Sequence, residues 1–247
     1  MESTRRIAVV AGVFFIVAAV AAVAGLVLYD PVLDNSHYIT GSGHDTRVLW
    51  GAFFEVILAI SVIGTAVTLF PIVKRQHEGI ALGYVAGRLV EAVVIVVGII
   101  SLLSVVTLRQ DLAGAAGAGG ASVVTAGQSL VAVHDWTFLF GPGLAIGLNT
   151  LMLAYLMYRS RLVPRFIALL GLIGGPMVFA SSIAVLFGLY DQLSAWSSIP
   201  TIPVFAWEMS LAVWLIVKGF KPSPVISGRP RYVGADEIGA ALAGAAA

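Results

Sequence analysis

Residues 79–103 read GIALGYVAGRLVEAVVIVVGIISLL, an apolar run that carries one arginine and one glutamate in its interior, Arg88 and Glu91. A helix needs about 20 predominantly apolar residues to cross a bilayer core of roughly 30 Å. Ionisable side chains at that depth cost about 2.5 to 3.5 kcal/mol each on insertion scales, so they face the interior of a bundle and have partners. The rest of the chain is therefore expected to shield these two charges from lipid.

The overall composition indicates a polytopic membrane protein. Of the 247 residues, 59% are hydrophobic and 11% are charged, and the mean hydropathy is +0.99. This is too little polar surface to cover a soluble domain of this size, so the expected surroundings are the lipid bilayer. The net charge of +1 gives no basic excess, and no nucleic acid partner is expected. The absence of cysteine excludes disulfides, thiolate nucleophiles, iron–sulfur clusters and cysteine-based zinc sites.

Six stretches have the length and hydrophobicity of a transmembrane helix, and they predict an all-α bundle. They lie at about 7–28, 48–72, 80–104, 131–157, 166–189 and 200–217. The first stretch has one alternative, a secretory signal, because Arg5 and Arg6 precede it and residues 22–24 (AVA) resemble a cleavage site. Its apolar run is too long for a usual signal core, so it is interpreted as a span. Residues 1–221 then form one six-helix transmembrane domain, and residues 222–247 a flexible cytoplasmic tail.

The basic residues predict the orientation, because cytoplasmic loops are enriched in lysine and arginine. Only Arg47 and Arg109 lie on one side of the predicted topology, and Arg88 lies inside a span. The remaining eleven are Arg5, Arg6, Lys74, Arg75, Arg159, Arg161, Arg165, Lys218, Lys221, Arg229 and Arg231, all on the other side. Both termini are therefore predicted to be cytoplasmic, with the protein in the cell (plasma) membrane.

Two further glutamates, Glu55 in the second span and Glu208 in the sixth, lie near the predicted midplane with Arg88 and Glu91. Arg88 and Glu91 are three residues apart on one helix face, and Arg88 has enough donors to bridge Glu91 and one of Glu55 or Glu208. One cation does not neutralise three carboxylates. Either a glutamate is protonated, or a bound cation or basic ligand group supplies the missing charge. The alternative is that this layer only holds spans two, three and six together.

A second polar track is predicted from His134, Asp135 and Asn149 on the fourth span, with Tyr84 beside Arg88 on the third. Asp135, Pro142 and Asn149 recur every seven residues, which predicts one face of a helix. The sequence Gly-Pro-Gly at 141–143 is expected to interrupt that helix. Broken helices of this kind occur in some transporter sites, but proline kinks in membrane helices are also common without such a role.

Small residues predict where helices approach one another closely. Gly79, Gly83 and Gly87 recur every four residues beside the charged face, and Gly171 and Gly175 do so on the fifth span. These faces are expected to receive a neighbouring helix, or to dock a second copy or another membrane protein.

The loop at residues 29–47 contains four side chains that are able to bind metals, namely Asp34, His37, His44 and Asp45. No regular element fixes them, so a solvated loop is the preferred interpretation. No metal or other cofactor is expected.

Several short motifs resemble a bacterial membrane family catalogued as domain of unknown function 4386. The resemblance covers about residues 5–221. It is carried by the basic N-terminus leading into AVVAGVFFI, Glu55, Arg88-x-x-Glu91, His134, LVPR at 162–165, Glu208 and the closing WLIVKGFK at 214–221. It implies a six-helix membrane protein and supplies no activity.

Three hypotheses for function remain at this point. The first is a small transporter or ligand-binding membrane protein, with proton coupling as one variant, whose small-molecule or proton site is the layer of Glu55, Arg88, Glu91 and Glu208. The second is a structural or accessory subunit whose buried charges specify packing. An intramembrane enzyme is the weakest, because the sequence shows no Ser/His/Asp or Cys/His set, no HExxH and no Gly-rich phosphate loop.

Overall fold

The computed structural model describes residues 2–35, 37–41, 44–113 and 121–227, and over these ranges it contains helices and no strand. The helices in chain order are α1 (Glu2–Leu33), the short 3₁₀ helix η1 (Tyr38–Thr40), α2 (Asp45–Val73), α3 (Glu78–Ala113), α4 (Ala121–Phe138), the π-helical segment η2 (Leu139–Ala145), α5 (Ile146–Ser160), α6 (Arg165–Leu186), α7 (Ala195–Val217) and α8 (Pro224–Ser227). The predicted all-α class is confirmed.

Among the described residues, six helices are long and apolar enough to cross a membrane, with α4, η2 and α5 forming one span over Ala121–Ser160. Five of the six predicted ranges lie inside them. The range 166–189 runs three residues too far, because α6 ends at Leu186. Gly188 adopts a left-handed conformation there, with φ of 71°, and this conformation stops a helix. Most of the predicted tail, residues 228–247, lies outside the described residues.

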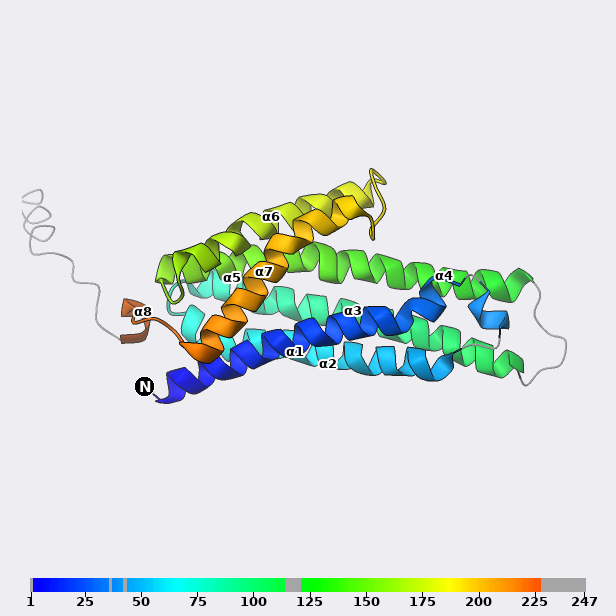
Figure 1. Cartoon of the computed structure of the whole chain (residues 1–247), viewed down its shortest axis with the longest axis horizontal. Helices are drawn as coiled ribbons and strands as arrows, with labels where there is room; N and C mark the ends of the chain where they lie inside the picture. Colours follow the sequence, from blue (N-terminus) through cyan, green and yellow to red (C-terminus); the bar gives the residue numbers. More distant parts are fainter. Residues whose placement is uncertain (1, 36, 42–43, 114–120, 228–247) are drawn as a thin grey trace, which may run out of the picture.

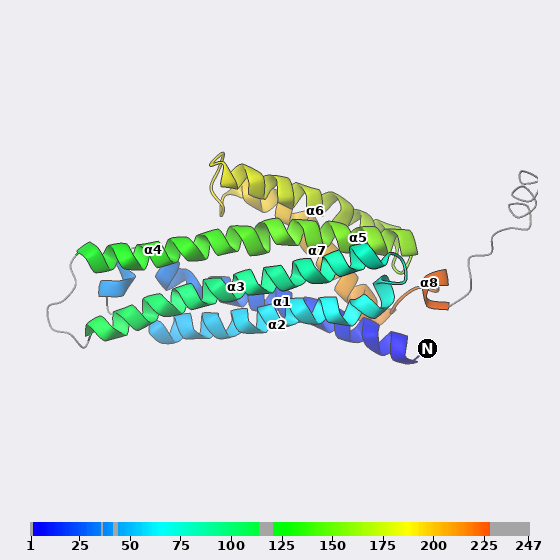
Figure 2. The same ribbon diagram turned by 180° about the vertical axis from the view of Figure 1, so that it is seen from behind.

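The long helices run side by side along the length of the molecule, and the N-terminus and α8 lie at the same end (Figures 1 and 2). We call this the basic end, because Arg5, Lys74, Arg159 and Lys218 lie at the helix ends gathered there. The opposite end, which holds η1 and the start of α4, is called the far end. Helix α7 crosses α1 near the basic end and slants away from it toward the far end (Figure 1).

Two apolar clusters hold the bundle together. One joins α1, α2, α3, α5, α6 and α7 toward the basic end, with Trp207 and Leu211 fully buried in it. The other joins α1, α2, α3 and η1 toward the far end, around Tyr29 and Leu102. Large apolar side chains such as Val93 and Val213 instead face outward, with exposed fractions of 62% and 55%. This outward apolar surface is what a lipid environment favours.

The glycine faces are filled from within the chain. A Cβ on Gly87 would lie 2.0 Å from Asn149 Oδ1, and a Cβ on Gly83 would lie 3.1 Å from Met152 Sδ, so α5 packs on this face of α3. A Cβ on Gly175 would lie 2.8 Å from the carbonyl oxygen of Gly147, so the backbones of α5 and α6 are nearly in contact. These faces therefore serve packing inside the bundle.

Candidate functional site

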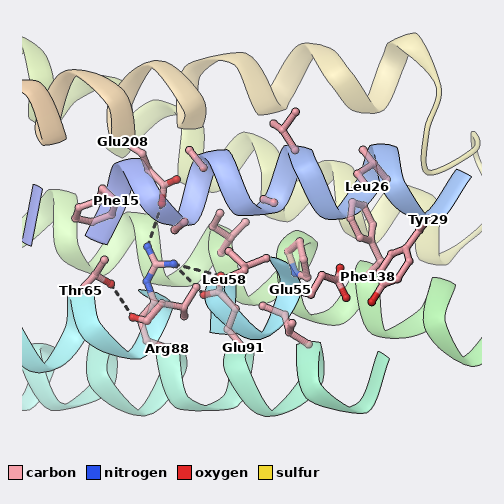
Figure 3. Close-up of a pocket in the computed structure, with 18 of the residues that line it drawn as sticks. Phe15, Leu26, Tyr29, Glu55, Leu58, Thr65, Arg88, Glu91, Phe138 and Glu208 are labelled. Atoms are coloured by element: carbon pink, nitrogen blue, oxygen red, sulfur yellow. Dashed lines mark hydrogen bonds and ion pairs between the residues drawn. The ribbon is translucent and has the colours of Figure 1, made fainter. Parts of the chain in front are cut away.

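Arg88 lies at the centre of a buried ion cluster that joins α3 to α7. Its side chain is 4% exposed, and Nη1 donates to both carboxylate oxygens of Glu91 at 3.2 Å. Nη2 donates to Glu208 Oε1 at 3.0 Å (Figure 3). The guanidinium also lies 5.8 Å and 5.7 Å from the ring centroids of Phe15 and Tyr84. Arg88 therefore bridges Glu91 and Glu208, which is one of the two arrangements predicted from the sequence; the other had Glu55 in place of Glu208.

Glu91 receives a further hydrogen bond from the fourth span. Asn149 is fully buried and donates from Nδ2 to Glu91 Oε2 at 2.7 Å. The absence of a side chain at Gly87 makes room for this amide. Three helices, α3, α5 and α7, are thus tied together by charge-assisted hydrogen bonds, which are stronger than neutral ones.

A cavity of about 210 Å³ extends from this cluster toward the far end between α1, α2, α3 and the fourth span. Its walls are mostly apolar, and its ionisable lining residues are Tyr29, Glu55, Arg88, Glu91, His134 and Glu208. The Arg88 cluster lies at one end, and Glu55 lies at the other, pointing toward Tyr29 (Figure 3). The predicted four-residue layer is therefore one cavity with two separate polar ends.

The polar end formed by Glu55, Tyr29 and His134 contains no arginine or lysine among the described residues. The Glu55 carboxyl group faces the Tyr29 hydroxyl and interacts with it and with His134, but no hydrogen bond of ordinary length joins Glu55 to Tyr29. The His134 ring packs edge-on against the Tyr29 ring at 5.6 Å, and its Nδ1 lies 3.6 Å from an Asp135 oxygen, too far for a hydrogen bond. Three polar groups thus surround a space that no other protein group fills.

The cavity carries an excess of acid. Arg88 is the one arginine or lysine among its lining residues, against the carboxyl groups of Glu55, Glu91 and Glu208. An isolated ionised carboxylate in a low-dielectric interior is very costly, so such a group is protonated or paired with a cation. Arg88 contacts Glu91 and Glu208 but not Glu55, so one excess carboxyl group lies in the Arg88 cluster and Glu55 is a second, at the other end of the cavity.

The fourth span places His134 and Asn149 in the interior and turns Asp135 outward. Asn149 is fully buried, whereas the Asp135 side chain is 62% exposed, so the expectation that they share one face does not hold. The physical reason is η2, whose π-helical turns hold one extra residue. At about 100° per residue, that insertion rotates Asp135 to roughly 140° from Asn149 and brings His134 to within about 40°.

Tyr84 lies beside the ion cluster, next to the Arg88 guanidinium. Its side chain is fully buried, and its hydroxyl lies 3.2 Å from Thr65 Oγ1 on α2. It contributes its ring to the wall around the Arg88 guanidinium.

Sequence reasoning missed Tyr29 as a site residue, because its position suggested an aromatic at the membrane interface. A signal was present: Ala18, Ala22, Gly25 and Tyr29 repeat at spacings of four, three and four, which is the pattern of one buried helix face. A Cβ on Gly25 would lie 2.9 Å from Glu55 Cγ, so this stripe of small residues is the surface that α2 and Glu55 pack against.

The far-end loop uses Asp45 in a polar cluster with Tyr38 and Arg109. Tyr38 donates its hydroxyl to Asp45 Oδ1 at 2.7 Å, and Arg109 Nη1 donates to Oδ2 at 2.5 Å. Burial, followed by the hydrogen bond to Asp45, raises the pKa of the Tyr38 hydroxyl, which keeps it a donor. Within the described residues, no group of three or more histidine, aspartate or glutamate side chains is placed to hold a metal.

The model of a family described as domain of unknown function (DUF4386) matches residues 10–219, which include the whole ion cluster and cavity. No curated protein and no solved structure matches the chain. The family match covers most of the chain, and the chain therefore belongs to the DUF4386 family.

Proposed function

We propose that this protein is a small transporter or ligand-binding membrane protein that takes a small cationic solute into the central cavity and exchanges it for a proton at Glu55. The observation that carries the proposal is a carboxyl group with no arginine or lysine partner in the described part of the chain, Glu55, facing a cavity that already contains two other carboxylates and one arginine. The cavity, at about 210 Å³, is smaller than the roughly 300–1,000 Å³ typical of drug-sized ligand pockets, which favours a cationic group of few atoms within it.

Electrostatics supports exchange between a proton and a cation. The groups that face the cavity around Glu55 are Tyr29 from α1, His134 from α4, Arg88 and Glu91 from α3 and Glu208 from α7. Arg88 is engaged by Glu91 and Glu208, so Glu55 has no arginine or lysine partner within the described residues. A proton or a bound cation satisfies the same carboxylate, and occupancy by one disfavours the other.

The Arg88 cluster favours a second role, in packing. It joins α3, α5 and α7 through paired groups. Removing one partner of such a buried pair destabilises the fold strongly, because the other charge is then left buried and uncompensated. That role accounts for Arg88, Glu91, Glu208 and Asn149, but not for Glu55. The two roles therefore belong to opposite ends of the cavity.

We further propose that the protein lies in the cell membrane with the basic end in the cytoplasm. The N-terminus and α8 share that end (Figure 1), where the basic loop residues also gather. Arg47 and Arg109 at the far end are engaged by Asp30 and Asp45, which lowers the free positive charge there.

The test is cation binding and proton release by the protein in lipid nanodiscs, with tetramethylammonium as the probe. Tetramethylammonium is expected to raise the melting temperature and to release protons into weakly buffered solution. Glu55→Gln should abolish both effects, because the amide neither releases a proton nor balances a cation. Glu78→Gln, an exposed glutamate at the start of α3, is the matched control and should behave like the wild type. If Glu55→Gln still binds the cation and releases protons, the proposal is wrong.

A further inference from the structure

We infer that the ligand is amphiphilic: its cationic group lies in the central cavity, and its apolar part lies in a groove between α1 and the α6–α7 hairpin. This inference rests on the proposed function, because it assigns the class of solute to the same site. The evidence for it is a second cavity that adjoins the first.

The groove has a volume of about 260 Å³ and is bounded by α1, η2, α6 and α7. It shares seven lining residues with the central cavity, among them Ala22, Phe138 and Glu208, so the two spaces are neighbours. The ribbon view shows why a groove forms here: α7 contacts α1 near the basic end and diverges from it toward the far end (Figure 1). A single elongated molecule is able to occupy both spaces.

Glu208 lies at the junction of the two cavities. Its side chain is 15% exposed, compared with 3% for Glu91 and 4% for Arg88. Its Oε1 accepts from Arg88, whereas Oε2 takes part in none of the hydrogen bonds described for this chain. One carboxylate oxygen is thus available to a ligand that passes from the groove into the cavity.

The walls of the groove match an apolar chain. Ala19, Ala22 and Val23 of α1 face Val204 and Phe205 of α7, and polar side chains, including Gln192, Ser197 and Thr201, lie at its far-end mouth. Val23 and Phe205 are 60% and 54% exposed at the surface of the bundle, where the surroundings are lipid. A solute that partitions into the bilayer therefore has a direct lateral route to Glu208.

Charge and shape together define the ligand class. An apolar groove that ends at a carboxylate, beside a cavity with excess acid, complements an amine or quaternary ammonium group on a short hydrocarbon chain. An anionic amphiphile of the same shape would meet Glu208, Glu91 and Glu55 and be repelled.

The experiment compares three probes on the protein in nanodiscs, with empty nanodiscs as the blank: tetramethylammonium, hexyltrimethylammonium and hexanesulfonate. We expect hexyltrimethylammonium to bind at least tenfold more tightly than tetramethylammonium, because burial of each methylene contributes favourably. Hexanesulfonate should not bind. Equal affinities for the two cations would overturn the groove inference and leave the proposed function standing, whereas absence of binding by both cations would contradict the proposed function itself. Binding of hexanesulfonate as tight as that of the cation would overturn the charge argument.

A matched pair of tryptophan variants locates the chain. Thr201→Trp fills the mouth of the groove, whereas Val213→Trp adds the same bulk to a lipid-facing position on the same helix. Thr201→Trp is expected to lose the advantage of the hexyl chain and keep tetramethylammonium binding, and Val213→Trp to keep both. An unchanged hexyl advantage in a folded Thr201→Trp protein would show that the chain lies elsewhere.

Discussion

At the scale of single residues, two carboxyl groups in the same cavity have different surroundings. Glu91 accepts from Arg88 and Asn149, whereas Glu55 faces Tyr29 and His134 and has no arginine or lysine partner among the residues that the structure describes. Removing one member of a buried ion pair destabilises the fold, because it leaves the partner's charge buried and uncompensated. A buried carboxyl group without a basic partner is instead a candidate for titration or ligand binding. Substitution is therefore expected to affect folding at one residue and binding at the other.

Arg88→Ala should destabilise the protein by about 3–5 kcal/mol, because it leaves Glu91 and Glu208 without their cation in a buried site. Glu55→Gln should change the free energy of unfolding by less than about 1 kcal/mol, because it breaks no ion pair. The measurement is reversible unfolding in mixed detergent micelles. Adding Glu91→Gln to Arg88→Ala should recover part of the loss. Similar losses for Arg88→Ala and Glu55→Gln would argue against this division of roles.

The sequence predicted part of this arrangement. Arg88 and Glu91 are three residues apart on one helix, so local geometry alone brings them together. The choice of Glu208 over Glu55 as the second partner depends on how α2 and α7 are rotated and how deep each lies against α3. Those quantities are set by packing between helices distant in the sequence, which hydropathy does not determine. The Asn149 contact likewise depends on the close approach permitted at Gly87.

At the scale of elements, the fourth span shows how a local irregularity changes which residues face the interior. A seven-residue repeat predicts that Asp135 and Asn149 lie together, and this holds only for an uninterrupted α-helix. The Gly-Pro-Gly at 141–143 indicated an interruption, but not the π-helical turns that place His134 in the cavity. Whether a proline produces a kink or π-helical turns depends on how the carbonyl groups that it leaves without a donor are accommodated, and on how the neighbouring helix packs there.

Helices α1 and α7 are also joined outside the membrane core, by Arg5. Its guanidinium donates to the carbonyl oxygens of Leu215, Ile216 and Val217 at the end of α7, where a helix has unsatisfied acceptors and partial negative charge.

We expect Arg5→Ala to cost about 1 kcal/mol of stability, because three acceptors at the end of α7 lose their donor. Arg6→Ala is the control, since it removes the same charge from an exposed side chain with none of the described hydrogen bonds. Thermal unfolding of both variants at low and high salt is the measurement. Equal losses in the two variants would mean that net charge, and not the contact with α7, is responsible.

At the scale of the whole molecule, the number of spans follows from hydropathy, because lipid requires every span to be a long apolar helix. The cavity and the groove do not follow from it. They exist because α7 crosses α1 at an angle, and that crossing is set by close contacts such as Gly12 of α1 against the carbonyl of Ala212, where a Cβ would lie 2.7 Å from the oxygen. Such contacts are visible only once the helices are placed together.

The orientation in the membrane decides from which side the cavity is loaded. This orientation can be measured directly, because the sequence has no cysteine and any introduced cysteine is the only thiol in the chain. Thr40→Cys lies in η1 at the far end, and His77→Cys lies in the turn between α2 and α3 at the basic end. Both positions are exposed, and neither substitution removes a lysine or arginine. A membrane-impermeant maleimide should label Thr40→Cys on intact cells, and His77→Cys only after permeabilisation, because the lysine and arginine side chains favour the cytoplasmic side. The reverse pattern would invert the orientation. Labelling of both positions on intact cells would contradict the crossing of α2 itself, since only that helix separates them.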